Sequence, residues 1–146
     1  MSVKVDLSGL IDFERFIDDM VNGFEEFLRK FLLKEALRAL ASTKRRTPYV
    51  TGHLRNSWQI SDVRKSGGYL IVEIFNPVEY ASYVEYGHAQ EPGRYVPAIG
   101  KRLKASWVPG KFMSTVAIKR VEAQLPRRYE TEFRKWVQGL NGKAWE

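Results

Sequence analysis

The hydrophobic pattern of the first third of the chain predicts one long helix. From about Ile11 to Ser42, apolar residues recur at intervals of four and three, so they share one helical face. This stripe begins with Phe13, Ile17, Met20, Phe24, Phe27 and Phe31. Ser8 or Asp6 is a candidate N-terminal cap, and the run Lys44–Pro48 favours an end to the helix. We expect the stripe to pack on the protein's own sheet; the alternative is a coiled-coil seam with a partner.

Alternating apolar and polar positions predict an antiparallel hairpin after this helix. The segments Trp58–Val63 and Tyr69–Phe75 have strand character, and Gly67-Gly68 between them is typical of a tight turn. In the second strand Leu70, Val72 and Ile74 form the expected core face.

The second half of the chain predicts shorter elements. A helix over 77–86 is expected to end at Gly87, and His88–Pro109 is irregular, with Tyr95-Val96 and Ser106–Val108 as possible arms of a projecting hairpin. Residues 111–124 have helical character, and Pro126 suits the first turn of a further helix that runs to Gly139. The prediction is one α+β domain over residues 1–146. In it a long N-terminal helix and C-terminal helices pack on a small antiparallel sheet, with a long basic loop or hairpin.

Composition supports a folded protein and excludes some kinds of cross-link and metal site. Among 146 residues, 44% are hydrophobic and 13% aromatic, which is too rich for a disordered chain. The absence of cysteine excludes disulfides and thiolate metal sites. The N-terminus lacks an apolar run of signal-peptide length, and no run reaches the length of a membrane span. We therefore expect a soluble protein made in a cytoplasm, with no membrane partner.

Charge is distributed unevenly along the chain. The net charge is +7, but residues 1–35 contribute −3 and residues 36–146 contribute +10. A basic balance of this kind fits a solvated surface, a contact with nucleic acid or docking on an acidic partner. Charge alone does not choose among these three interpretations.

Catalytic patterns are poorly represented. The two histidines, His53 and His88, are 35 residues apart, and the chain has no zinc-protease motif, no Gly-rich phosphate loop and no nucleophile elbow. A ribonuclease-like toxin would use Glu85 and His88 as base and acid, and their spacing of three would put them on one helical face. Two such residues three apart are, however, common by chance. We expect no enzymatic activity, no metal and no cofactor.

Three short motifs hold most of the information in the sequence. The first runs from Thr47 to Ser57 and follows the pattern T-P-x-x-T-G-x-L-R-x-S. Physically it predicts a connection from helix to strand: Pro48 sets the chain direction, Gly52 takes a positive φ, and Leu54 returns to the core. Its residues are Thr47, Pro48, Thr51, Gly52, Leu54, Arg55 and Ser57, and the last two, with Asn56, are expected to lead into the first strand.

The second motif, Y-A-x-Y-V-E-Y-G, covers residues 80–87, and the third is W-V-P-G-K-F-M over residues 107–113. In the second, the packing and turn positions are expected to be Tyr80, Ala81, Tyr83, Val84 and Gly87. Glu85 is expected to face solvent or to pair with Arg55 or Arg94; the functional alternative is an ion pair between subunits. The third motif contributes Trp107, Val108, Gly110, Phe112 and Met113.

In this order, the three motifs resemble the neck and tail-completion family of tailed double-stranded DNA bacteriophages and prophages, in which the third segment opens the C-terminal helix. The resemblance implies a minor structural protein of the virion, assembled in the host bacterial cytoplasm. It implies a homo-oligomeric ring, usually six-fold, that joins the tail terminator or tail tube to the head connector. This chain departs from the commonest pattern at Val50 and His53, and Trp107–Met113 replaces an R-P-F-[LM] ending.

A basic cluster beside Trp107 suggests a contact surface. Arg94, Lys101, Arg102 and Lys104 stand against one acid, Glu91, and cations interleaved with aromatic residues suit a phosphate backbone. If the chain follows this family, the basic cluster faces genomic DNA in the channel or a neighbouring ring. An ordinary solvated loop and a basic DNA-binding accessory protein are the alternatives.

Overall fold

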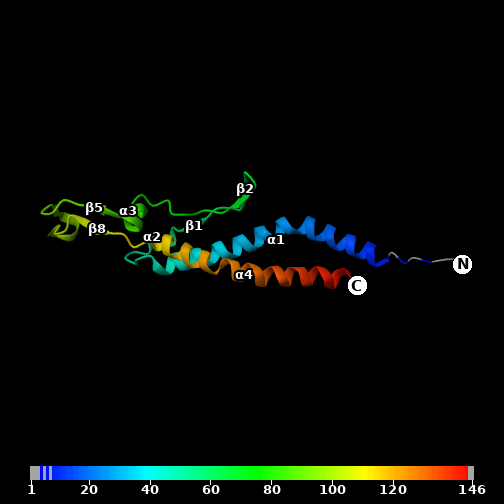
Figure 1. Cartoon of the computed structure of the whole chain (residues 1–146). Coiled ribbons are helices and arrows are strands. Elements are labelled where there is room, and N and C mark those ends of the chain that lie inside the picture. The colour runs from blue at the N-terminus through cyan, green and yellow to red at the C-terminus, as the bar shows by residue number, and fades with distance from the viewer. Residues whose placement is uncertain (1–3, 5, 7, 145–146) are drawn as a thin grey trace.

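Two long antiparallel helices form the body of the protein (Figure 1). In the computed structural model, which describes residues 4, 6 and 8–144, α1 (Ser8–Arg46) and α4 (Met113–Ala144) lie side by side over much of their length. The segment between them forms α2 (His53–Asn56), α3 (Ala81–Tyr86), a 3-10 turn η1 (Pro97–Ile99) and short strands. The fold is therefore α+β, as the sequence predicts.

The strands pair as four separate antiparallel ladders within the described residues. These are β1 (Gln59–Ile60) with β4 (Ile74–Phe75), β2 (Arg64–Ser66) with β3 (Tyr69–Ile71), β5 (Gly87–Ala89) with β8 (Trp107–Pro109), and β6 (Tyr95–Val96) with β7 (Lys101–Arg102).

The predicted N-terminal helix is confirmed and is longer than expected. The carboxylate of Asp6 accepts a hydrogen bond of 2.9 Å from the backbone N–H of Ser8, the first helical residue. This contact supplies the N-terminal cap. The helix ends at Arg46, within the basic run before Pro48.

The partner of the helical stripe differs from the prediction. Phe27 and Phe31 pack on α4 rather than on a sheet: the Phe27 ring centroid lies 5.0 Å from that of Trp136, and that of Phe31 lies 5.6 Å from that of Tyr129. Strands of two or three residues are too short to cover a helix of 39 residues, whereas α4 presents a matching aromatic stripe.

Buried charge joins the same two helices. Glu35 is almost fully buried, and its carboxylate lies 2.6 Å from the Arg128 guanidinium of α4 and 3.3 Å from that of Arg38. Lys34 and Glu132 form a further pair at 3.3 Å. Because removing one partner of a buried pair leaves an uncompensated charge, Glu35 and Arg128 fix the register of α1 on α4.

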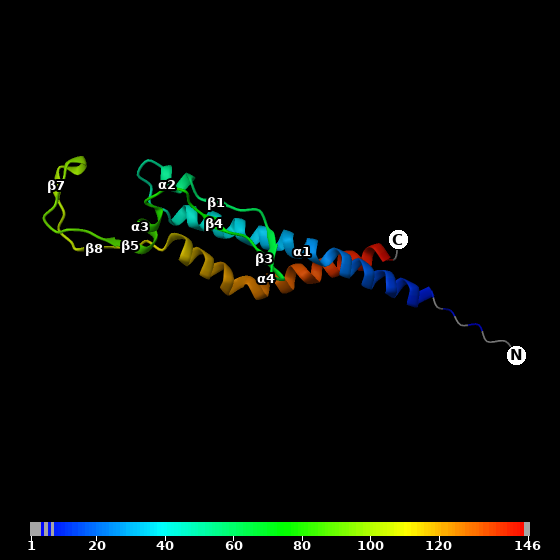
Figure 2. The same ribbon diagram turned by 90° about the horizontal axis from the view of Figure 1, so that it is seen from above.

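A single helix replaces the two predicted at the C-terminus. Pro126 lies inside α4, not at the start of a new helix. Proline inside a helix removes one backbone donor and clashes with the preceding turn, which kinks or breaks the helix. Figure 2 shows that α4 changes direction in its orange part, around residue 125.

The first hairpin is present but interrupted. Ile60 faces Ile74 while Arg64 faces Ile71, so residues 61–63 stand opposite only residues 72 and 73, as in a β-bulge. Beyond the bulge, the hairpin docks on α1, where Lys65 lies 2.8 Å from the Glu25 carboxylate. The expected core face of Leu70, Val72 and Ile74 is partly buried.

A second hairpin, the distal hairpin of residues 87–109, projects from the helical body (Figures 1 and 2). The predicted pairing of its arms is wrong, because Tyr95 pairs with Arg102 and Trp107 pairs with Ala89. The hairpin thus contains two ladders, an inner one of β5 and β8 and an outer one of β6 and β7. It is longer than the two predicted arms implied. None of the helices in the described part of the chain combines the length and apolar character that a membrane crossing requires.

Candidate functional site

The three sequence motifs meet at one place, called here the motif junction. Leu54 of the first motif, Ala81 of the second and Met113 of the third form one buried cluster with Trp58. Leu40, Ile74, Val78 and Val84 pack around it. Segments that are far apart in sequence thus share the core at the end of α1 and the start of α4.

Thr47 holds the end of α1 in this junction. Its hydroxyl donates to the Thr43 carbonyl at 2.8 Å and accepts a bond of 2.9 Å from the indole N–H of Trp58. Its own carbonyl accepts two bonds from the Arg55 guanidinium, at 2.9 and 3.2 Å. A cation at a helix C-terminus also interacts favourably with the helix dipole. Arg55 therefore stabilises the end of α1 both by hydrogen bonds and by its charge.

The remaining residues of the first motif shape the turn. Gly52 has a φ of 82°, as predicted, and a Cβ there would lie 2.8 Å from the Tyr49 ring. Residues 53–56 form the short helix α2 instead of leading directly into a strand. Thr51 accepts a bond from the His53 N–H at its start, and Ser57 donates to the His53 carbonyl at its end. The exposed Pro48 follows the end of α1.

Glu85 neither faces solvent nor pairs with Arg55 or Arg94, in contrast to the prediction. Its side chain is 3% exposed, and its carboxylate accepts hydrogen bonds from the backbone and the hydroxyl of both Ser114 and Thr115, at 2.7–3.1 Å. These two residues form the first turn of α4. Glu85 therefore caps α4 from a separate helix, and its pairing with a neighbouring subunit stays a prediction.

The electrostatics of Glu85 follow from this cap. Burial is the largest single influence and raises the pKa of the carboxyl. The hydrogen bonds from Thr115 and Ser114 together outweigh burial and hold the pKa below its ordinary value. The group is therefore a carboxylate at neutral pH, where the positive end of the α4 dipole stabilises it.

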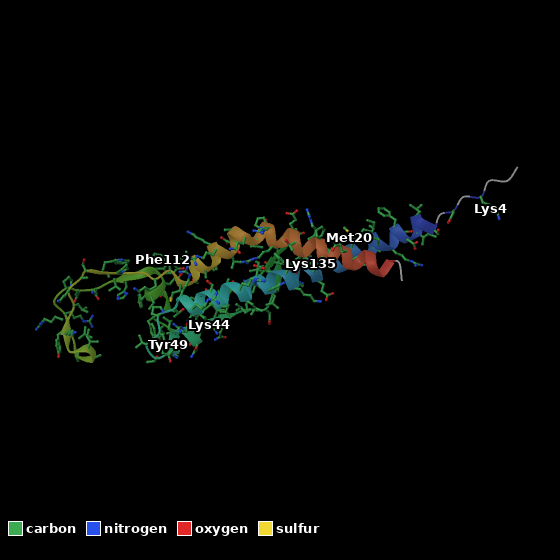
Figure 3. All side chains as sticks on the ribbon, turned by 90° about the horizontal axis from the view of Figure 1, so that it is seen from below. Lys4, Met20, Lys44, Tyr49, Phe112 and Lys135 are labelled. Atoms are coloured by element: carbon green, nitrogen blue, oxygen red, sulfur yellow. The ribbon has the colours of Figure 1, made fainter. Side chains whose placement is uncertain are left out.

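Two glycines allow the second and third motifs to cross. At Gly87, with φ 85°, a Cβ would lie 2.5 Å from the Val108 carbonyl oxygen; at Gly110 it would lie 2.3 Å from the Glu85 carbonyl oxygen. Neither contact is sterically possible, so only glycine fits at these two positions. Figure 3 places Phe112 at this crossing, where the distal hairpin enters α4.

Backbone bonds complete the crossing. Lys111 donates to the Val84 carbonyl at 2.8 Å and Phe112 to the Glu85 carbonyl at 3.0 Å. Phe112 has a φ of 48°, the one positive value among the described residues other than glycine. Such a strained conformation persists only where the surroundings enforce it, and Met113, fully buried, follows at once.

Several motif residues are not packing positions. Tyr80 and Tyr83 are largely exposed, in contrast to the prediction, and so is Trp107, while Val84 and Val108 are partly buried. Tyr83 and Trp107 lie at the base of the distal hairpin, and Tyr80 borders the turn of the first motif. All three side chains are available for contacts with other molecules.

The basic cluster lies on the distal hairpin. Arg102 donates to the Gly93 carbonyl at 2.7 Å and lies over the Tyr95 ring. Arg94, Lys101 and Lys104 are exposed, and within the described residues none of the four cations forms an ion pair. The distal hairpin therefore presents three exposed cations, Arg94, Lys101 and Lys104, to solvent.

The residues considered for catalysis are not arranged for it. His53 is exposed, and Glu85, the partner considered for His88, is occupied by α4. Nowhere in the described residues do three or more acidic or histidine side chains gather as metal ligands would.

Sequence reasoning missed several residues of the junction, namely Thr43, Trp58, Asn76, Ser114 and Thr115. The Ser-Thr pair directly after the third motif is a helix-start signal that would have located the first turn of α4. Asn76 donates to the Leu54 carbonyl at 2.8 Å and accepts from the Val78 N–H; this contact has no local sequence signal.

Comparison with known proteins agrees with the motifs. The model of the family described as "Bacteriophage HK97-gp10, putative tail-component" matches residues 11–87, more than half of the chain. The match includes the first two motifs, whereas the third lies beyond it. Neither a curated protein nor a solved structure matches the chain. The chain belongs to the HK97-gp10-like family of bacteriophage tail components.

Proposed function

We propose that the protein completes the phage tail at the head–tail junction as the repeating subunit of a ring. The observation that supports this most is the balance of buried and exposed apolar residues. Among the described residues, 19 large hydrophobic side chains are exposed, whereas eight hydrophobic residues are buried. Exposed apolar surface on this scale is typical of a subunit whose contacts are completed by other chains.

In this proposal the function is binding, with no chemistry. The motif junction fixes the distal hairpin to the helical body, so that every copy presents the same surfaces. Cyclic symmetry then repeats one contact around an axis, which we expect to be six-fold. The ring would join the tail terminator or tail tube to the head connector in the virion.

Electron microscopy of lysates tests this proposal. The gene is deleted from the parent phage or prophage, and a plasmid copy restores it in the control. We expect filled heads and finished tails that lie apart in the deletion and joined, infectious particles in the control. Intact infectious particles without the gene would reject the junction role. Missing or defective tails would place the protein elsewhere in the tail.

A second candidate function, contact with DNA, is favoured by three exposed cations of the distal hairpin, Arg94, Lys101 and Lys104. If Arg94, Lys101 and Lys104 bind phosphates, replacing all three with glutamine weakens binding to duplex DNA. It also flattens the salt dependence, by about 0.9 in log–log slope for each lost phosphate contact. Arg102 is left in place because it bonds to Gly93.

Fluorescence anisotropy with labelled DNA over a series of salt concentrations measures both effects. The matched control replaces Lys119, Arg120 and Arg127, three exposed cations of α4, with the same loss of charge. Equal effects of the two triple variants would indicate non-specific attraction by net charge and would reject a role for the hairpin.

A further inference from the structure

The two ends of the molecule have opposite charge. The N-terminal arm, residues 8–21 of α1, contains four acids and one base, giving −3. The distal hairpin contains four cations and one acid, giving +3. Figures 1 and 2 show the arm and the hairpin at opposite ends of the elongated body.

Both ends also expose apolar side chains. Leu10, Phe13, Ile17 and Val21 follow one another at spacings of three, four and four residues, so they form one helical row, and each is 38–70% exposed. Glu14 and Asp18, spaced four apart, flank this row on the helix surface.

The row extends past the end of its partner helix. Because Phe24 contacts Trp136 and Phe31 contacts Tyr129, the antiparallel register brings the end of α4 near residue 16 of α1. Leu10 and Phe13 therefore project beyond α4, and within the described residues they lack an apolar partner. On the hairpin, Tyr95, Ile99 and Trp107 are each more than half exposed.

Charge decides which of these ends meet. A symmetric contact would bring two arms of −3 together, or two hairpins of +3, and like charges at an interface are unfavourable. A contact between unlike ends pairs opposite charges around two apolar centres. We propose that the N-terminal arm of one copy binds the distal hairpin of the next copy.

In this contact the Leu10–Phe13 end of the arm packs on Ile99, at the outer end of the hairpin, while Glu14 and Asp18 face Lys101 and Lys104. The contact joins different surfaces, so it propagates from copy to copy, and it gives a finite assembly where the series of copies closes into a ring. This inference rests on the proposed ring, for which it names the interface.

Cysteine cross-linking tests the interface, because the native chain has no cysteine. A chain with Phe13→Cys and Ile99→Cys complements the deletion, and the purified particles are oxidised and run on a non-reducing gel. We expect a ladder of covalent oligomers, and monomers only from either single variant. The matched control pairs Ile99→Cys with Tyr69→Cys, which is 74% exposed on the first hairpin. The proposed interface is wrong if the double variant is incorporated into particles but stays monomeric. It is also wrong if only the control gives a ladder.

Charge reversal provides a second test that does not depend on disulfides. One variant has Glu14→Lys and Asp18→Lys, and the other has Lys101→Glu and Lys104→Glu. Each alone has like charges at both ends and should fail to complement the deletion, with a loss of at least tenfold in plaque yield. Expressed together they restore opposite charges at every contact, and we expect complementation to return. Complementation by either variant alone, or failure of the folded pair together, contradicts the proposal.

The outcomes separate the interface from the function. If the deletion leaves heads and tails unjoined but the chain with Phe13→Cys and Ile99→Cys gives no ladder, the junction role is retained and this contact is rejected. If the double variant gives a ladder but particles stay joined when the gene is deleted, the contact is retained and the junction role is rejected.

Discussion

Glu85 shows how one buried carboxylate links two elements of this protein. It belongs to α3, yet its four hydrogen-bond donors belong to the first turn of α4. The start of a long helix leaves several backbone N–H groups without partners, and here a distant residue satisfies two of them. The cap thereby ties the second motif to the helix that follows the third.

Replacing Glu85 with glutamine should destabilise the fold by about 2 kcal/mol at neutral pH, because the cap loses its charge and part of its hydrogen bonding. Chemical denaturation measures the change. The matched control is Glu79→Gln, an exposed position between β4 and α3, which should change stability little.

This contribution depends on pH. Since the folded pKa of Glu85 lies below its ordinary value of 4.5, the stabilisation is complete above that value and is lost as pH falls through the folded pKa. The difference between wild type and Glu85→Gln should therefore shrink below about pH 4.5. A difference that stays constant down to pH 3 would show that the charge of Glu85 does not stabilise the fold.

Gly87 offers a second test at this scale, with an internal control. Gly87→Ala introduces both a positive φ and a clash with backbone, whereas Gly93→Ala, at φ 88°, introduces the strained φ in open space. Gly93→Ala should cost about 1 kcal/mol and Gly87→Ala at least twice as much. Thermal unfolding shows which variant is less stable. Equal losses of stability would mean that the backbone at the crossing shifts to make room for the methyl group.

Local turn chemistry explains which residues the sequence could predict. Gly52, Leu54 and Gly87 take the conformations expected of them because the turn each one forms depends on its immediate neighbours. The role of Glu85 was not predictable in this way, since its donors lie 29 and 30 residues further along the chain.

At the scale of elements, α1 and α4 stabilise each other through stacked aromatic rings. Phe27 lies within 6.3 Å, centroid to centroid, of five other rings, three of them on α4. The short ladders add little apolar area of their own. The helix pair therefore supplies much of the packing outside the motif junction.

Phe27→Ala should lower the free energy of unfolding by about 3 kcal/mol, since it removes a ring from the centre of this stack. Phe13→Ala removes the same side chain from the exposed arm and should stay within about 0.5 kcal/mol of wild type. Urea denaturation compares them. Similar losses would place Phe13 in a packed position within the single chain.

The helical stripe of α1 was predictable from spacing, but its partner was not. Periodicity identifies an apolar face and contains no information about what covers it. Pro126 illustrates the same limit: proline is compatible with the first turn of a helix and with a kink inside one. Contacts with α1 hold α4 on both sides of Pro126, since Met113 before it packs with Leu40, and Arg128 and Trp136 after it contact Glu35 and Phe27. The proline therefore lies inside one helix.

At the scale of the whole molecule, the projecting hairpin buries little apolar surface. Its outer ladder contains two residue pairs, and its cations are exposed. Segments with little buried apolar surface open locally at small free-energy cost. The two long helices contain more tryptic sites than the hairpin does, but they hold them in regular structure.

Limited trypsin digestion should therefore cut first between Arg94 and Lys104, while Arg128, paired with the buried Glu35, survives longest. Intact-mass spectrometry over a time course identifies the order of cuts. An early cut at Arg128 would mean that the helix pair opens before the hairpin. In particles, the proposed contact predicts slower cleavage of the hairpin.

The crossing at Gly87 and Gly110 has a mechanical consequence. Both strands of the distal hairpin pass through one point without room for a methyl group, and Glu85, two residues before Gly87, holds the first turn of α4. The base of the hairpin is therefore bonded to the start of a helix of 32 residues. If a bound partner displaces that base, the first turn of α4 has to move with it, because the crossing leaves no free space between them.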